Sequence, residues 1–235
     1  MGLKKHIPNA ITSLNLLCGV IGIVLFFKNN DLAFAAMLAA IIFDFCDGLA
    51  ARLLGVISPR GKELDSLADV VSFGVLPAIM MAGTADYLYQ GGPWRWLCAI
   101  PLLISVFSAL RLSKFNLDER QHESFIGLPT PASALICGAL CCIAPETTPF
   151  WVFPAVAAVL CFLLVSELPM FSFKFGKDIK ADVATRMLRY AIISIAAIII
   201  VVVALLHLPW QTIILGVLLA YILENALYCL FKPKA

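Results

Sequence analysis

Long apolar stretches, separated by short polar segments, run the whole length of this chain of 235 residues. Several charge-poor windows reach about 18 residues, which is the length expected of a transmembrane helix. The pattern predicts eight spans, at about 9–27, 32–53, 66–84, 94–111, 131–145, 150–167, 188–207 and 210–230. We therefore expect an all-α protein, a polytopic membrane helix bundle with about eight transmembrane helices.

The composition agrees with a membrane setting. Hydrophobic residues make up 62% of the chain and charged residues 14%, whereas soluble domains carry about 25% charged residues. The net charge of +2 is small, and no basic stripe carries interleaved aromatics, so a nucleic-acid partner is not expected. No linker of domain-separating length interrupts the spans, so residues 1–235 are predicted to form a single integral-membrane domain.

The basic residues alternate between the predicted loops. With the N-terminus inside, 15 of the 17 Lys and Arg residues fall in cytoplasmic segments, and only Lys28 and Arg95 fall on the opposite side. This asymmetry follows the positive-inside rule. It predicts a multi-pass protein of the cytoplasmic (inner) membrane, with both termini cytoplasmic and with contacts to anionic membrane lipid.

Four aspartates gather at the junction of the second and third predicted spans. Asp44 and Asp47 are three residues apart, and Asp65 and Asp69 are four apart, so each pair shares one face of a helix. The segment from Val56 to Gly61 is expected to form the turn that lets the two faces meet. All four acids are placed at the cytoplasmic face by the charge pattern.

Carboxylates in this position need a counter-charge. One charged Asp near a bilayer centre costs about 2.5–3.5 kcal/mol on insertion scales, so such residues are usually paired and functional. Hard divalent cations prefer carboxylate oxygens. We therefore predict a metal site formed by Asp44, Asp47, Asp65 and Asp69. The alternative is a capped helical hairpin in which the acids are only solvated side chains beside a loop. This alternative fits Asp44 poorly, because Asp44 lies about two turns inside the helix.

The whole frame reads D-x2-D-G-x2-A-R-x8-G-x3-D-x3-D from Asp44 to Asp69, and it resembles the signature of the CDP-alcohol phosphotransferase family. The resemblance implies transfer of a phosphoryl-alkyl group from a CDP-alcohol to a second alcohol, with release of CMP. It also implies a six-helix core over about residues 1–170, two additional C-terminal helices at about 188–230, and a homodimer.

The resemblance assigns roles to the acids. Asp44, Asp47 and Asp65 would be the principal ligands of a two-metal site holding Mg²⁺ or Mn²⁺, and Asp69 would contribute to it. The last aspartate of the signature would act as general base, so Asp69, with Asp65 beside it, is the expected catalytic group.

Small and polar residues near the acids predict a pocket for the CDP-lipid. Gly48 and Ala51 lack bulk and share the face of Asp47, although small residues also serve helix packing. Arg52 is expected either to hold phosphate or to pair with an aspartate. The entry Pro8-Asn9-x2-Thr12-x2-Asn15 resembles the start of family members, and its polar face either reaches the nucleotide or packs inside the bundle. The expected CDP-lipid-binding residues are Asn9, Thr12, Asp47, Gly48, Ala51, Arg52 and Gly61.

Two further stretches bear on the acceptor. Residues 109–116 (ALRLSKFN) and 125–131 (FIGLPTP) resemble a pair of motifs in the phosphatidylserine synthase branch of the family. That likeness implies CDP-diacylglycerol as donor and L-serine as acceptor, with Arg111, Lys114 and Asn116 binding serine. Positive-inside anchoring also explains Arg111 and Lys114. Glycerol 3-phosphate, inositol phosphate and choline remain open as acceptors, and a divalent-metal transporter is the alternative from another class.

Overall fold

The computed structural model describes residues 6–56, 58–117, 125–144, 146–170 and 183–231. The regular secondary structure of the described residues is helical apart from two strands of two residues each. The helices are α1 (His6–Phe26), α2 (Asn30–Leu54), α3 (Pro59–Asp69), α4 (Leu76–Tyr87), α5 (Leu103–Leu117), α6 (Thr130–Ile143), α7 (Val152–Val165), α8 (Val183–Leu205) and α9 (Gln211–Phe231). A π-helical turn, η2 (Val70–Val75), joins α3 to α4, and a 3-10 segment, η3 (Arg95–Leu102), leads into α5.

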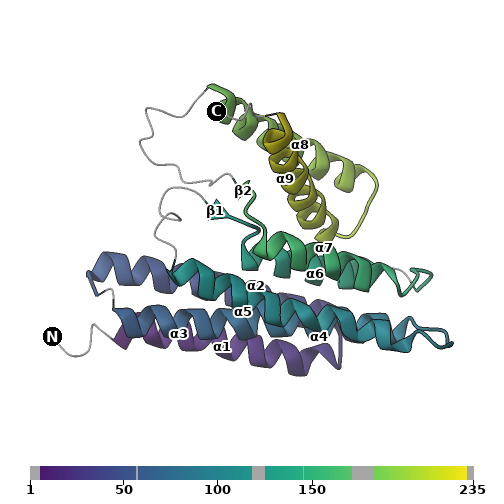
Figure 1. Ribbon diagram of the computed structural model, residues 1–235, viewed down its shortest axis with the longest axis horizontal. Coiled ribbons are helices and arrows are strands. Elements are labelled where there is room, and N and C mark those ends of the chain that lie inside the picture. Colours follow the sequence, from purple (N-terminus) through teal and green to yellow (C-terminus); the bar gives the residue numbers. More distant parts are fainter. Residues whose placement is uncertain (1–5, 57, 118–124, 145, 171–182, 232–235) are drawn as a thin grey trace.

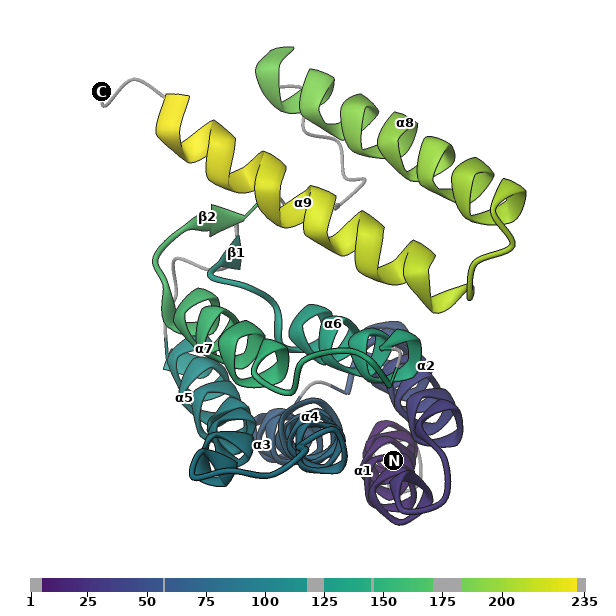
Figure 2. The ribbon, with the colours of Figure 1, turned by 90° about the vertical axis from the view of Figure 1, so that its right-hand side faces the viewer.

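The first seven helices form one bundle, with α1 to α5 running along its length (Figure 1). Helix α1 packs along α2, and the α3–α4 rod lies between α1 and α5. Helix α9 packs on α6, and α8 packs on α9 outside the bundle (Figure 2). The strands β1 (Phe125–Ile126) and β2 (Pro169–Met170) pair antiparallel, with Phe125 opposite Met170.

Each of the eight predicted spans overlaps a helical segment. Four continuous segments are long and apolar enough to cross a membrane: His6–Phe26, Asn30–Leu54, Pro59–Tyr87 and Arg95–Leu117. Among the described residues the other apolar helical stretches are shorter, from Thr130–Ile143 to Gln211–Ala226. The prediction of an all-α, polytopic membrane helix bundle is confirmed, while the cytoplasmic orientation of the termini stays a prediction.

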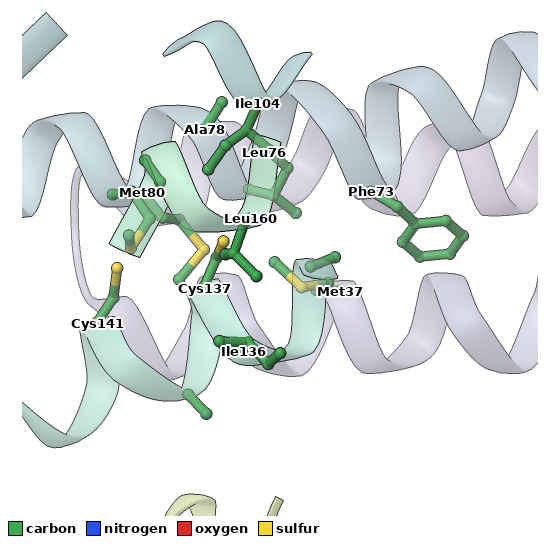
Figure 3. Close-up of a cluster of buried hydrophobic side chains, with 14 of the residues drawn as sticks. Met37, Phe73, Leu76, Ala78, Met80, Ile104, Ile136, Cys137, Cys141 and Leu160 are labelled. Atoms are coloured by element: carbon green, nitrogen blue, oxygen red, sulfur yellow. The ribbon is translucent and has the colours of Figure 1, made fainter. Parts of the chain in front are cut away.

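The bundle is held by an apolar interior. Figure 3 shows Met37 of α2, Leu76 of α4, Ile104 of α5 and Ile136 of α6 around a common centre, and all four are fully or almost fully buried. Large apolar side chains also stay exposed on the outside, for example Phe162. A helix that is apolar all round is typical of a membrane span, so the outer residues suit contact with lipid.

The turn that joins the two aspartate-bearing helices differs from the predicted one. Helix α2 ends at Leu54 because Gly55 adopts φ +62°, the left-handed conformation in which glycine caps helices. Ser58 then caps α3, where its Oγ accepts a hydrogen bond of 3.1 Å from the Gly61 N–H. The expectation that Gly61 belongs to the turn is therefore wrong: Gly61 lies in the first turn of α3, since Pro59 starts the helix earlier.

The helix ends place the functional side chains together. Helices α1 and α3 begin, and α2 and α5 end, toward the same end of the bundle (Figure 1). This end therefore carries both aspartate pairs, the polar start of α1 and the basic end of α5.

Candidate active site

Three of the four aspartates form a tight carboxylate cluster. Oxygen atoms of Asp44 and Asp47 on α2 and of Asp65 on α3 all lie within 4.8 Å of one another. Asp69, one turn after Asp65, lies outside this group and is 8% exposed. The i+3 and i+4 spacing thus brings both pairs to one interhelical face, with Asp69 one turn further along α3.

The cluster has the chemistry of a cation site. Like charges this close repel strongly in a poorly solvated environment. Among the described residues the ion pairs are Arg95–Asp86 and Lys114–Glu167, so none of these four acids is in an ion pair there. Oδ1 of Asp65 is buried without a hydrogen-bond partner. A bound divalent metal would supply both the positive charge and the missing partner, so the residues fit such an ion.

Helix α1 braces both pairs with polar side chains from one face. The Thr12 hydroxyl donates to Oδ2 of Asp47. One turn later, Nδ2 of Asn15 donates a hydrogen bond of 3.1 Å to Oδ1 of Asp69. Thr12 and Asn15 are both buried, so their positions are fixed by helix packing.

A first cavity of about 300 Å³ opens on the α1 side of the cluster. Its walls include every residue predicted to bind the CDP-lipid: Asn9, Thr12, Asp47, Gly48, Ala51, Arg52 and Gly61.

Two glycines shape that cavity in different ways. A Cβ added at Gly48 would meet no atom within 4 Å, so helix packing does not require a glycine there. A Cβ at Gly61 would come within 3.3 Å of Oδ1 of Asn9 and 3.1 Å of Oγ of Ser58.

Arg52 is exposed, and its Nε donates a 3.0 Å hydrogen bond to the Gly48 carbonyl. Arg52 is expected either to hold phosphate or to pair with an aspartate. The ion pairs of the described residues do not include one between Arg52 and an aspartate.

A second cavity of about 260 Å³ opens on the α5 side of the same cluster. It is lined by Asp44, Lys62, Asp65, Ser66, Asp69, Arg111, Leu112, Phe115, Asn116, Pro129 and Pro131. Asp65 and Lys62 line both cavities. The carboxylates therefore stand where two separate cavities meet.

Arg111 is the buried cation of the second cavity. It is 7% exposed, its Nη1 donates a 3.1 Å hydrogen bond to Oγ1 of Thr130, and its guanidinium carbon lies 5.5 Å from the centre of the Phe115 ring. Its Nε is buried without a hydrogen-bond partner. A fixed guanidinium with an unused N–H is suited to bind an anion.

The other two predicted serine-binding residues lie differently. Asn116 lines the second cavity, where its Nδ2 donates a 2.8 Å hydrogen bond to Oγ of Ser66. Lys114 is absent from the described lining and instead forms an ion pair of 3.3 Å with Glu167, with side chains 41% and 78% exposed. The structure brings Arg111 and Asn116 to the cavity but not Lys114.

Comparisons with known proteins agree on the family. The model of CDP-alcohol phosphatidyltransferases matches residues 5–166. The chain belongs to the CDP-alcohol phosphatidyltransferase family. The match contains both cavities and α1 to α7 and leaves α8 and α9 outside, while the extent of the domain stays a prediction. With its spanning helices, this CDP-alcohol phosphatidyltransferase is an integral membrane protein.

Three relatives are informative. A CDP-diacylglycerol–serine O-phosphatidyltransferase of Bacillus subtilis is 39% identical over 132 residues, which cover 56% of this chain and 72% of that protein. A protein of the same name from Methanocaldococcus jannaschii is 37% identical over 57% of this chain and 60% of its own length. The archaetidylserine synthase of Methanothermobacter thermautotrophicus is 38% identical over 55% of this chain and 54% of its own length.

Sequence reasoning missed several polar residues of this family site. Lys62 and Ser66 of α3 line the second cavity together with Asp65, and nothing in the spacing marks them. Thr130 contacts Arg111 across 19 residues. Asn15 belongs to the polar face that the sequence predicts, three residues after Thr12, but its contact with Asp69 has no signal in the sequence.

Proposed function

We propose that this enzyme transfers the phosphatidyl group of CDP-diacylglycerol to the hydroxyl of L-serine, which gives phosphatidylserine and CMP. The observation that carries the proposal is the meeting of two cavities at one carboxylate cluster, with Asp65 and Lys62 in the walls of both. Transfer between two bound substrates needs this arrangement, because the reacting atoms must lie about 3 Å apart. The names of the relatives support serine as acceptor.

The first cavity is assigned to the donor. Open space beside Gly48 lets a flat base or a pyrophosphate approach the backbone of α2. Arg52, already held through its Nε, can offer its remaining N–H groups to a phosphate. The apolar outside of the bundle leaves the acyl chains of the lipid in the bilayer.

The carboxylate cluster is assigned to Mg²⁺ or Mn²⁺, with Asp44, Asp47 and Asp65 as ligands. Asp69, one turn after Asp65 on α3, is assigned a contribution to a two-metal site. Such ions, when bound, neutralise charge on the phosphoryl oxygens and on the departing CMP. Lys62, whose Nζ donates a 3.2 Å hydrogen bond to the Asn116 carbonyl, adds a movable cation where the transferred phosphate passes.

Asp69 is assigned as the general base that takes the proton of the acceptor hydroxyl, since it lines the second cavity. Its carboxylate takes the proton of the serine hydroxyl, and the serine oxygen forms a bond to the lipid-side phosphorus. The bond from that phosphorus to the CMP oxygen breaks, and CMP leaves with the electron pair. Asp69 then releases the proton to solvent.

The charges of the second cavity favour serine among the acceptors considered. Arg111 suits one carboxylate, and the aspartates nearby suit the ammonium group of an amino acid. Choline has no anion for Arg111. A phosphate-bearing acceptor such as glycerol 3-phosphate or inositol phosphate would place two negative charges beside the aspartates.

The orientation belongs to the same proposal. The helix ends that carry the site also carry five basic residues: Arg52, Arg60, Lys62, Arg111 and Lys114. By the positive-inside rule, this charge supports an active site at the cytoplasmic face of the inner membrane. A homodimer stays a prediction from the family resemblance.

The test is a panel of labelled acceptors. Purified protein in detergent receives CDP-diacylglycerol, Mn²⁺ and labelled serine, glycerol 3-phosphate, inositol phosphate or choline, and the label is sought in lipid. Label from serine alone supports the proposal. Label from another alcohol would replace the acceptor, and metal flux into sealed vesicles without any CDP-lipid would favour a transporter.

A further inference from the structure

One buried amide contacts the group assigned as general base. Asn15 of α1 is 0% exposed, and its Nδ2 donates a hydrogen bond of 3.1 Å to Oδ1 of Asp69. The two residues are 54 positions apart, so the contact exists only because α1 and α3 pack together. Asn15 does not line either cavity.

The backbone of α1 is held in place at Asn15. The Ser72 hydroxyl donates a 3.0 Å hydrogen bond to the backbone carbonyl of Asn15. One turn further along α1, a Cβ added at Gly19 would lie 2.8 Å from Cα of Ser72, so the two backbones are in direct contact there. Ser72 belongs to the π-helical turn that begins immediately after Asp69. Such turns are frequent at functional sites, and here the turn carries the residue that fixes Asn15.

The contact makes the two oxygens of the Asp69 carboxylate different, because only Oδ1 accepts the hydrogen bond from Asn15. Oδ1 is taken by Asn15, and Asp69 also lines the second cavity, so the part that Asn15 does not hold is available to the acceptor. Asn15 is neutral, so it orients the carboxylate without cancelling the charge that attracts a proton. Oδ1 of Asn15 itself is buried without a hydrogen-bond partner. The stability of the bundle alone therefore does not explain why an amide side chain stands at this buried position.

We propose that Asn15 is a positioning residue that fixes the Asp69 carboxylate so that its free oxygen faces the acceptor hydroxyl. The proposal rests on the proposed function, since it assumes that Asp69 accepts the proton. Thr12 has the matching place at Asp47, one turn earlier on the same face. Helix α1 thus braces one carboxylate of each pair.

The experiment compares Asn15→Leu, which keeps the branched shape of the side chain and removes the amide, with the wild type and with Ser13→Ala as control. Ser13 is exposed on α1, and its hydroxyl contacts only the Asn9 carbonyl among the described residues. Removing a residue that orients a reactive group typically costs about 10–100-fold in activity. We expect Asn15→Leu to lose kcat by this factor, with the KM values of both substrates and the Mn²⁺ affinity within about threefold of wild type.

Three outcomes would overturn the inference: an unchanged kcat, a fall in kcat no larger than that of Ser13→Ala, or an equal loss of kcat, donor affinity and Mn²⁺ affinity, which indicates a purely structural role. If Asn15→Leu does not fold, Asn15→Ser is measured by the same criteria. Wild-type protein without serine-dependent turnover would refute the proposed function instead, and the variants are then compared with the alcohol that does support CMP release.

Discussion

Replacing Arg111 by Gln gives a specific test of the acceptor cavity. Arg111 is 7% exposed and keeps a buried Nε without a partner, so its unused N–H is expected to bind the serine carboxylate. A hydrogen bond to a charged group contributes about 1.5–3 kcal/mol. At about 1.4 kcal/mol for each factor of ten, the KM for serine should rise roughly 10- to 150-fold.

The assay is steady-state CMP release in mixed micelles, with serine varied at saturating donor. The KM for CDP-diacylglycerol should stay within about threefold of wild type, because Arg111 does not line the donor cavity. Lys114→Ala is measured beside it. Its exposed ion pair with Glu167 has a typical value of about 0–1 kcal/mol, so we expect a serine KM no more than about fivefold higher.

Two results would refute this reasoning. One is an unchanged serine KM in folded Arg111→Gln protein, and the other is an equal rise in both KM values. A Lys114 effect as large as that of Arg111 would make Lys114 the carboxylate ligand.

Three further predictions follow from the site. Asp69→Asn should lower kcat by about 10²–10⁴ while CDP-diacylglycerol binding survives, and turnover near wild type would remove Asp69 from the base role. EDTA should abolish turnover and Mn²⁺ should restore it. Asp65→Asn should weaken Mn²⁺ binding by roughly tenfold or more, which a titration followed by electron paramagnetic resonance measures. An unaltered Mn²⁺ affinity would contradict the assignment of Asp65 as a metal ligand. Gly48→Leu should keep or slightly raise the Tm, because Leu favours helix over Gly by about 0.5–1 kcal/mol and a Cβ at this position meets no atom within 4 Å. It should nevertheless raise the donor KM, and a lower Tm would show that the position is needed for helix packing.

The hydropathy pattern and the spacing of the aspartates predicted the fold and half of the site. Apolar runs located the helices because a membrane span must be long and apolar, and the i+3 and i+4 spacing placed Asp44 with Asp47 and Asp65 with Asp69. The structure adds that the oxygens of Asp44, Asp47 and Asp65 converge within 4.8 Å.

The rest depended on packing between distant segments. The Asn15–Asp69 and Arg111–Thr130 contacts join residues 54 and 19 positions apart, and no local pattern encodes them. Gly61 was assigned to the turn because glycine often marks one, but Gly55 and Ser58 already end and start the helices. The motif resemblance groups Lys114 with Arg111 and Asn116, but the partner of Lys114, Glu167, lies 53 residues away in the sequence.

The central claim is direct transfer between two substrates bound in cavities that meet at the carboxylate cluster. The most direct measurement is the amount of CMP and of phosphatidylserine formed from CDP-diacylglycerol and Mn²⁺, with and without serine. CMP should appear only when serine is present, in amounts equal to the phosphatidylserine. CMP released at the same rate without serine, or in excess of the lipid product, would contradict it.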